Sequence, residues 1–382
     1  MTTYADPAAR ARRRSVDTEP PRPPKRPRDP LWARICLIIG ALVMVASGTI
    51  VVLPKILANW AAGDIPQQPL IPPDLIGANI DGAINLLLLG MDERAGNSTE
   101  PIRADTIIIV HIPKTHDKVY MISLPRDAEV NIPDFPETNF KGWRTKINAA
   151  FAAGARLDGK PDPSPQGRER GAQLTMMTIN NLMPGGLKFN GAAIINFAGF
   201  KGVLKAIDGV DMCVDVETRS IHYDKNNKYH TLVPYADRKV YKKGCYHMTY
   251  IEALDFARQR HFDNGDYTRQ RHQQQLLLAM FRKLISKGVL TDLGKLTELQ
   301  KSAGDLLTLD LGRTEIADWV FTLKGLRADD VVMIKTNGGK VTPIGNGNER
   351  LSDETMELLK AIHDDTVFEF LVQHPTWVAT EK

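Results

Sequence analysis

The feature that most constrains this chain is an uncharged apolar run near its N-terminus. From Ile35 to Leu53 the sequence ICLIIGALVMVASGTIVVL carries no charge, and at about 1.5 Å per helical residue it is just long enough to cross a hydrocarbon core of roughly 30 Å. A cleavable signal peptide is the alternative, but the apolar core of a signal peptide is typically only about 7–15 residues long. We therefore predict one retained transmembrane helix within residues 31–54.

Basic residues crowd the N-terminal side of this run, with nine lysines and arginines against four acids in residues 1–34. Because positive charge is retained on the cytoplasmic side, this flank predicts a cytoplasmic tail and an extracytoplasmic remainder in a single-pass protein of the cell membrane. Residues 1–30 are rich in proline and should be disordered. The tail could bind nucleic acid, but it lacks interleaved aromatic residues, so we expect no nucleic-acid partner. Residues 55–82 are predicted to be a stalk.

The rest of the chain alternates between strand-like and helix-like patterns. Apolar runs bounded by turns predict strands at 84–90, 105–112 and 118–124, joined as an antiparallel meander. Further strands are expected at 192–195, 210–216 and 330–336. Helices are expected at 173–182, 198–207, 249–258, 267–287, 291–306, 313–326 and 352–363, and loops at 155–170 and 222–239. This alternation indicates one α/β domain, residues 83–382, with a central mixed β-sheet flanked by helices.

Acidic and arginine side chains occur at the ends of the three meander strands. Asp92 follows the first strand, Asp105 opens the second and Arg126 follows the third, so all three should meet at one end of the sheet. Mg²⁺ takes few carboxylates and fills its other positions with phosphate oxygens, and guanidinium groups such as those of Arg94 and Arg103 clamp further oxygens. Each residue alone is better explained as a surface ion pair, but together they predict a magnesium and phosphate site.

The predicted helix 267–287 begins with the stretch GDYTRQRHQQQ. At 100° per residue, Asp266, Arg269 and Gln273 share one face. The same face continues as an apolar stripe made of Leu277, Met280 and Leu284. A core-facing Arg269 needs a partner, which is either Asp266 or an anionic ligand. We predict that the polar turns at the start of this helix point inward.

The other side of the same helix carries a different set of polar residues. Arg271 and Gln275 lie opposite the apolar stripe, and His272 lies on a flank. We expect these side chains to face solvent or to act structurally, and not to contact the ligand.

Weaker candidates lie elsewhere along the chain. Arg258 and Arg260 precede the helix by one loop and could reach the same cleft, although capping of a helix C-terminus is the commoner role for such residues. Lys146 in KINAAF and Asn196 in NFAGF sit beside apolar residues. The usual signals of metalloproteases, nucleotide hydrolases, serine hydrolases and dehydrogenases are missing from the sequence.

The cysteines also bear on the compartment. Cys36 lies in the predicted membrane span, which leaves Cys213 and Cys245 as an even pair beyond it. Disulfides persist outside the cytoplasm, so we predict that these two are bonded, with two independent buried thiols as the alternative.

Seven ordered segments of the sequence resemble those of one known family. They are NLLLLGMDER, RADTIIIV, SLPRD, KINAAF, NFAGFKGVLKAIDGVD, ALDFARQR and GDYTRQRHQQQ. In this order they resemble the LytR-CpsA-Psr family of membrane-anchored cell-wall phosphotransferases, over roughly residues 85–284. The resemblance implies the family's α/β fold behind one transmembrane helix.

The resemblance also implies a reaction. A glycopolymer phosphate, from a wall teichoic acid or an arabinogalactan, would pass from a polyprenyl-pyrophosphate carrier to the C6 hydroxyl of N-acetylmuramic acid in peptidoglycan. Polyprenyl phosphate would be released, magnesium would be the cofactor, and pyrophosphatase activity would accompany transfer.

Residue roles carry over from the family position by position. Asp92 and Asp105 would hold the metal, and with Arg126 and Arg269 they would form the catalytic group. The pyrophosphate would be bound by Arg103, Arg126, Lys146, Arg258, Arg260, Asp266, Arg269 and Gln273. The alternative function is that of a non-catalytic membrane protein that binds a lipid pyrophosphate or the cell wall and has a regulatory role.

Overall fold

The computed structural model describes residues 67–91, 100–260, 266–288, 302 and 307–379. Among these residues, no helix is both long enough and apolar enough to cross a membrane. The predicted cytoplasmic tail, the predicted transmembrane helix, Asp92, Arg94 and nearly all of the predicted helix 291–306 lie outside the described residues.

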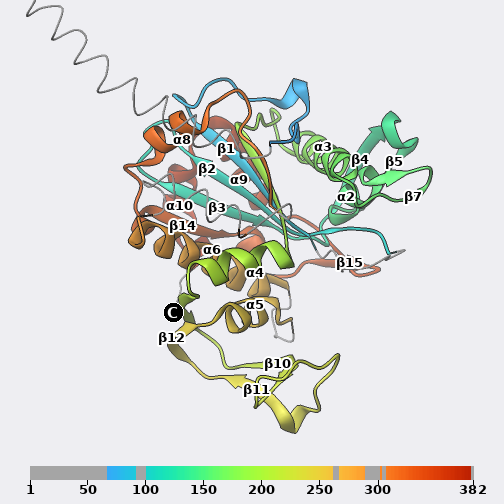
Figure 1. The fold of residues 1–382 in the computed structure, drawn as a ribbon. Coiled ribbons are helices and arrows are strands. Elements are labelled where there is room, and N and C mark those ends of the chain that lie inside the picture. Colours follow the sequence, from blue (N-terminus) through green and yellow to red (C-terminus); the bar gives the residue numbers. More distant parts are fainter. Residues whose placement is uncertain (1–66, 92–99, 261–265, 289–301, 303–306, 380–382) are drawn as a thin grey trace, which may run out of the picture. The chain divides into compact units, whose positions relative to one another are not determined.

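A six-stranded mixed sheet forms the centre of the domain, in the order β13-β8-β1-β2-β3-β14 (Figure 1). The predicted meander is confirmed: β1 (Ile84–Met91), β2 (Ala104–Ile112) and β3 (Val119–Leu124) pair antiparallel in sequence. Two strands extend the sheet in parallel, β8 (Gly191–Asn196) beside β1 and β14 (Val331–Lys335) beside β3. The edge strand β13 (Leu307–Asp310) runs antiparallel to β8.

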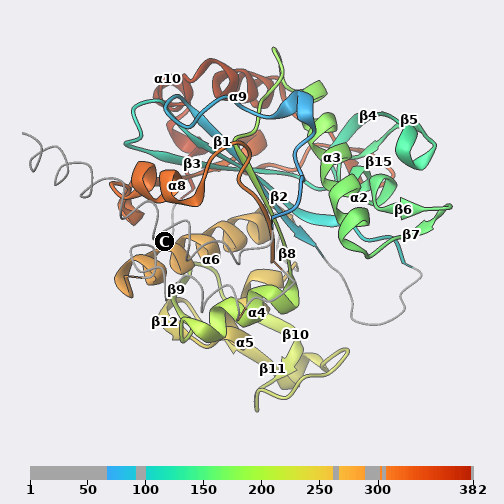
Figure 2. The same ribbon diagram turned by 45° about the horizontal axis from the view of Figure 1, so that its top comes forward.

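Both faces of the sheet are covered, which explains why its strands are apolar at nearly every position. Alternate residues of β2 enter different cores: Ile107 and Ile109 pack into one, Ile108 and Val110 into the other. Because successive strand side chains point to opposite faces, the sheet is the middle layer of three. Figure 2 shows the helices divided between its two sides.

The helices on the first face are α2 (Asn148–Gly154), α3 (Pro165–Leu182), α9 (Asp353–Asp364) and α10 (Val367–Gln373). The second face carries α8 (Ile316–Leu323) and α6 (Asp266–Ser286). The helices α4 (Phe197–Ala206) and α5 (Tyr250–Arg258) share a further apolar core with α6. The predicted α/β architecture with a central mixed sheet is therefore confirmed.

Short two-stranded sheets decorate this framework. They pair β4 (Glu129–Phe135) with β5 (Phe140–Lys146), β6 (Arg156–Leu157) with β7 (Lys160–Pro161), β10 (Thr218–Asp224) with β11 (Arg238–Tyr241), β12 (Gly244–Met248) with β9 (Val210–Val214), and β15 (Pro343–Gly345) with β16 (Asn348–Glu349). Among these strands, only β9 was expected from the sequence.

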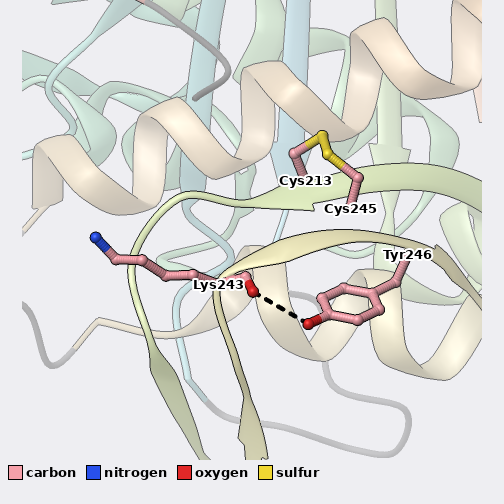
Figure 3. Close-up of a disulfide and its surroundings, with 4 residues drawn as sticks. All are labelled: Cys213, Lys243, Cys245 and Tyr246. Carbon is pink, nitrogen blue, oxygen red and sulfur yellow. Dashed lines mark hydrogen bonds between the residues drawn. A yellow bond between two sulfur atoms is a disulfide. The ribbon is translucent and has the colours of Figure 1, made fainter.

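A disulfide joins Cys213 on β9 to Cys245 on β12, the pair proposed from the cysteine count. The two residues are direct partners in the antiparallel register, with Cα atoms 3.9 Å apart. The Tyr246 hydroxyl donates to the Lys243 carbonyl at 3.2 Å beside it (Figure 3). Since β9 packs against α6 through Met212, the disulfide fastens the strand that supports this helix.

Three predicted boundaries are wrong. Part of the predicted stalk belongs to the packed domain, because Leu70 and Ile71 are buried in the first core. The predicted loop 155–170 contains the start of α3, where the Ser164 side chain caps the helix and Pro165 occupies its first turn. The predicted loop 222–239 contains the end of β10 and the start of β11.

Candidate active site

A cavity of about 460 Å³ lies between the sheet and the helices α4, α5 and α6. Its polar lining consists mainly of Asp105, Thr106, His222, Arg258, Arg260, Arg269 and Gln273. Its apolar lining includes Leu88, Ile108, Ala193, Ile195, Phe200, Val203, Leu254, Leu276, Leu277, Met280, Leu284 and Leu307. The cavity can therefore accept one ligand that has both an anionic part and an apolar part.

Asp105 is the centre of the polar end of this cavity. One carboxylate oxygen accepts from Arg126 at 2.8 Å and the other from Arg260 at 2.9 Å. Arg269 donates to the Asp105 backbone carbonyl at 3.2 Å. Burial raises the pKa of the Asp105 carboxyl, but the Arg126 guanidinium, followed by Arg260 and Arg269, outweighs burial and holds this pKa below its usual value. The ionised Asp105 carboxylate thus binds two guanidinium groups, and the Asp105 backbone carbonyl binds a third.

The helix α6 forms one wall of the cavity along its length. Arg269, Gln273, Leu277, Met280 and Leu284 all line it, at the spacing expected for one helical face. Arg269 and Leu284 are separated by roughly 22 Å at 1.5 Å per residue, so the polar and apolar parts of the lining lie toward opposite ends. This placement agrees with the helical-wheel prediction for Arg269 and Gln273. The Asp266 side chain is not among the parts of the chain that the structure describes.

Two further arginines of the cavity are positioned by the end of α5. The intervening Gln259 is buried, and its Nε2 donates to the Asp255 carboxylate at 2.8 Å, while its Oε1 accepts from the Ile221 backbone at 3.1 Å. Tyr241 also donates to Asp255, at 2.8 Å. With Gln259 held inward, its neighbours Arg258 and Arg260 are placed on the cavity side.

Three of the predicted site residues, Arg126, Lys146 and Arg103, do not line the cavity. Lys146 does not line it but pairs with Asp127 at 2.8 Å, and Arg126 approaches the other Asp127 oxygen at 3.4 Å. Arg103 is exposed just before β2 and does not line the cavity. Direct contact of Lys146 or Arg103 with a ligand therefore stays a prediction.

A family model for the LytR_cpsA_psr family matches residues 65–362, which is more than half of the chain. The chain belongs to this family. The match includes β1 and α6 and so spans both walls of the cavity, and it begins ahead of the buried Leu70.

Relatives of known name support this membership. A polyisoprenyl-teichoic acid–peptidoglycan teichoic acid transferase, TagU of Bacillus cereus, is 31% identical over 229 residues, which is 59% of this chain and 61% of that protein. TagV of Bacillus subtilis, a transferase of the same description, is 26% identical over 215 residues, 56% of this chain and 47% of that protein. The matches thus span less than two thirds of these relatives.

Solved structures share the fold. The crystal structure of TagV from B. subtilis aligns with a TM-score of 0.54 and 21% identity, covering 75% of this chain and 98% of the other. A structure described as TagT bound to LI-WTA aligns with a TM-score of 0.55 and 22% identity, covering 79% and 98%.

The side of α6 away from the cavity was expected either to face solvent or to act structurally, and the structure shows that it does not face solvent. Gln275 and His272 are buried and not solvent-facing, because β9 and the α5 residue Phe256 pack against this side. His272 and Arg271 both pair with Asp215, at 2.9 Å for His272. Burial lowers the pKa of His272, with Asp215 opposing this effect. As the alternative reading expected, Arg271 is structural and does not line the cavity.

Several residues in or around the cavity were not predicted from the sequence. Asp127 was visible beside Arg126 in the SLPRD segment, but its partner Lys146 is 19 positions away. Asp215 and His272 are 57 positions apart, and no local pattern connects them. His222, which lines the cavity, fell within a segment predicted as a loop.

The part of the chain that the structure describes contains no cluster of three metal-binding side chains. Asp105 is nevertheless an ionised carboxylate facing a cavity, which is what Mg²⁺ requires when phosphate oxygens complete its coordination. Asp92, the second expected ligand, follows β1 directly and lies outside the described residues.

Proposed function

We propose that this protein transfers a glycopolymer phosphate from a polyprenyl-pyrophosphate carrier to the C6 hydroxyl of N-acetylmuramic acid in peptidoglycan. The observation that carries the proposal is the cavity itself, in which guanidinium groups around Asp105 give way along α6 to an aliphatic channel. A polyprenyl pyrophosphate has the same division into a dianionic head and a hydrocarbon tail. The names of the teichoic acid transferases among the relatives support the same chemistry.

The residues at the polar end have distinct tasks in this reaction. Arg258, Arg260 and Arg269, which line the cavity, neutralise and orient the two phosphates together with Arg126, which binds Asp105, and Asp105 holds the guanidinium groups in register. The acceptor oxygen forms a bond to the phosphorus that carries the glycan, and the bridging P–O bond breaks to release polyprenyl phosphate. Phosphoryl transfer depends on positioning and charge neutralisation, so we propose direct transfer without a covalent enzyme intermediate.

Water in place of the sugar hydroxyl would hydrolyse the same bond, so we propose pyrophosphatase activity as a side reaction. Asp105 and Asp92 would hold Mg²⁺. When bound, this ion supplies further positive charge to the phosphate oxygens.

We also propose that the apolar run at residues 35–53 anchors the chain in the cell membrane as a single pass. The basic flank of this run supports a cytoplasmic N-terminus, which places the cavity outside the cell, where peptidoglycan is assembled.

The test uses the full-length chain in detergent with Mg²⁺, a lipid-linked glycan donor and peptidoglycan fragments. We expect ligated product and polyprenyl phosphate, and we expect Asp105→Ala and Arg126→Ala each to lower turnover by at least about 100-fold. Trp143→Ala, an exposed aromatic on β5, is the control for handling and expression and should behave as the wild type.

The alternative is a binding protein without catalysis. It would bind the lipid-linked donor with an affinity that falls in Arg126→Ala, yet release no polyprenyl phosphate in any variant. That outcome would replace the proposed transfer.

A further inference from the structure

A protruding hairpin arises at the polar part of the cavity lining. It consists of β10, β11 and the segment between them, residues 218–241, and we call it the arm. It projects beyond α5 in both ribbon views (Figures 1 and 2). Ile221 and His222 on β10 line the cavity, so the arm begins where the proposed phosphate site is and leads away from it.

Aromatic rings follow one another along the arm. The ring of His222 stacks on Tyr229 with centroids 5.7 Å apart, and Tyr229 meets Tyr223 edge-on at 5.5 Å. Elsewhere on the arm, the ring of Tyr235 has the guanidinium groups of Arg219 and Arg238 at 5.0 and 5.6 Å from its centroid. These contacts connect a residue of the cavity to rings on the surface.

Two of these rings are largely open to solvent although they are ordered by neighbours. Tyr229 is 59% exposed and Tyr235 is 66% exposed. Single exposed aromatics are ordinary, whereas exposed apolar groups gathered on one element commonly mark a binding surface. Because the rings are already held by contacts within the arm, a ligand would lose little side-chain freedom on binding them.

The arm is also fixed at its tip and at its base. At the tip, the Asp224 carboxylate accepts from the backbone of Asn226 and Lys228, both at 2.9 Å. At the base, the Gln259 amide binds the Ile221 backbone at 3.1 Å. An isolated two-stranded hairpin is at best marginally stable in water, and these contacts supply order that the strand pairing alone would not.

Positive charge exceeds negative charge on the arm. Residues 218–241 contain five lysines and arginines and two aspartates. Both aspartates are engaged within the arm, Asp224 by the turn and His230, and Asp237 by Lys225 at 3.2 Å. Arg219 and Lys239 also pair with Glu217 and Glu252 beside the arm, at 3.3 and 2.6 Å. The surface therefore combines exposed rings with cationic side chains, among them Lys228 and Arg238.

We propose that the arm binds the acceptor strand of the transfer reaction, a glycan whose peptide stems carry carboxylates. The C–H face of a sugar ring packs on the electron-rich face of a tyrosine, and the basic side chains attract the carboxylates. The arm thereby guides a sugar hydroxyl from Tyr235 and Tyr229 toward His222 and the phosphates. This inference rests on the proposed function for the reaction that the acceptor completes.

A membrane surface is the other partner that basic and aromatic residues fit. Interfacial segments bury a continuous apolar face of Trp, Phe and Leu side chains. Among the described residues of the arm, the strongly exposed large hydrophobic side chains are one leucine, Leu232 at 68%, and two tyrosines. The glycan is therefore the better match.

The experiment compares a double variant, Tyr229→Ala with Tyr235→Ala, with the conservative double variant carrying phenylalanine at both positions. The full-length chain in detergent is assayed for the KM of soluble peptidoglycan fragments at saturating donor. Binding to insoluble peptidoglycan is measured separately by co-sedimentation without donor. Trp143→Ala, 68% exposed on β5, is the control for loss of an exposed aromatic ring.

The alanine variant should raise the acceptor KM roughly tenfold, as expected for two lost ring contacts, and co-sediment correspondingly less. The phenylalanine variant and Trp143→Ala should stay close to the wild type. An unchanged acceptor KM in the alanine variant overturns the proposal. Co-sedimentation with vesicles of anionic phospholipid is measured in parallel, and a variant that loses binding to vesicles but not to peptidoglycan also overturns it. If the wild type transfers nothing, the proposed reaction has failed, and co-sedimentation alone then decides whether the arm binds peptidoglycan.

Discussion

At the scale of single residues, Asp105 shows how the site is assembled from distant parts of the chain. Its carboxylate binds Arg126, 21 positions away, and Arg260, 155 positions away. Sequence analysis could place Asp105 and Arg126 at one end of the sheet because strand order was visible in the apolar runs. The sequence could not show that Arg260 pairs with Asp105. Arg260 is positioned by its neighbour Gln259, whose side chain is held by hydrogen bonds to Asp255 and to the backbone of Ile221.

The lowered pKa of Asp105 predicts how stability depends on pH. A carboxyl whose pKa is lower in the folded than in the unfolded state stabilises the fold above the unfolded pKa and loses this contribution as pH falls through the folded pKa. The difference in free energy of unfolding between wild type and Asp105→Asn should therefore be constant above about pH 5 and shrink below about pH 4. Urea denaturation at several pH values measures it. A difference that grows toward acid pH would contradict the assigned direction.

Two arginines on the same helix provide a matched comparison. Arg269 lines the cavity, whereas Arg271 pairs with Asp215 away from it. We expect Arg269→Ala to lower kcat/KM by about 100-fold or more and Arg271→Ala to change it only a few-fold. Arg271→Ala should instead lower the free energy of unfolding by about 1–3 kcal/mol, since the partly buried Asp215 loses one of its two cationic partners. Equal losses of activity would refute the division of α6 into two faces.

At the scale of elements, the helices and strands predicted from the sequence are those whose apolar residues recur at a regular spacing. The meander and α6 follow from apolar runs and a helical stripe. The strands β5 and β10 were missed because their residues are largely exposed or half-buried, so no alternation of apolar and polar residues marks them. The burial of Gln275 was also missed, because a helical wheel shows which residues share a face but not whether β9 covers the opposite one.

The disulfide between β9 and β12 should contribute to stability. It closes a loop with a sequence separation of 32, for which chain-entropy arguments give about 3–4 kcal/mol. The double variant Cys213→Ser with Cys245→Ser should lose free energy of unfolding of this order in denaturant titration. A thiol titration of the unreduced, denatured full-length wild type should find one thiol, from Cys36. Three thiols would show that the bond is not formed.

At the scale of the whole domain, the cavity exists because the helices α4, α5 and α6 do not close completely on the second face of the sheet. On the first face, α3 and α9 pack directly and leave a continuous core. The asymmetry could be anticipated only in part from sequence, since the same aliphatic residues serve a core and a lipid channel equally well. Leu277 and Met280 illustrate this ambiguity: both fit a core stripe, and both line the cavity.

Filling the channel should separate recognition of the lipid tail from recognition of the head. Ala193 on β8 lines the cavity, and Ala193→Phe would displace tail methylenes worth about 0.8 kcal/mol each. We expect the KM for a long-chain polyprenyl donor to rise about tenfold, while a short-chain analogue is little affected. Ala198→Phe, at an exposed position of α4, is the control. An equal effect on both donors would place the tail elsewhere.

The pairing of both Asp105 oxygens with guanidinium groups has a consequence for how a ligand enters. The polar end of the cavity is already partly charge-compensated before any phosphate arrives, so binding is an ion exchange in which one anion takes over the arginine partners of another. The affinity for a diphosphate is then the difference between two sets of charge-assisted hydrogen bonds. Such a site favours an anion with enough oxygens to engage several guanidinium groups at once and discriminates against simple monovalent anions.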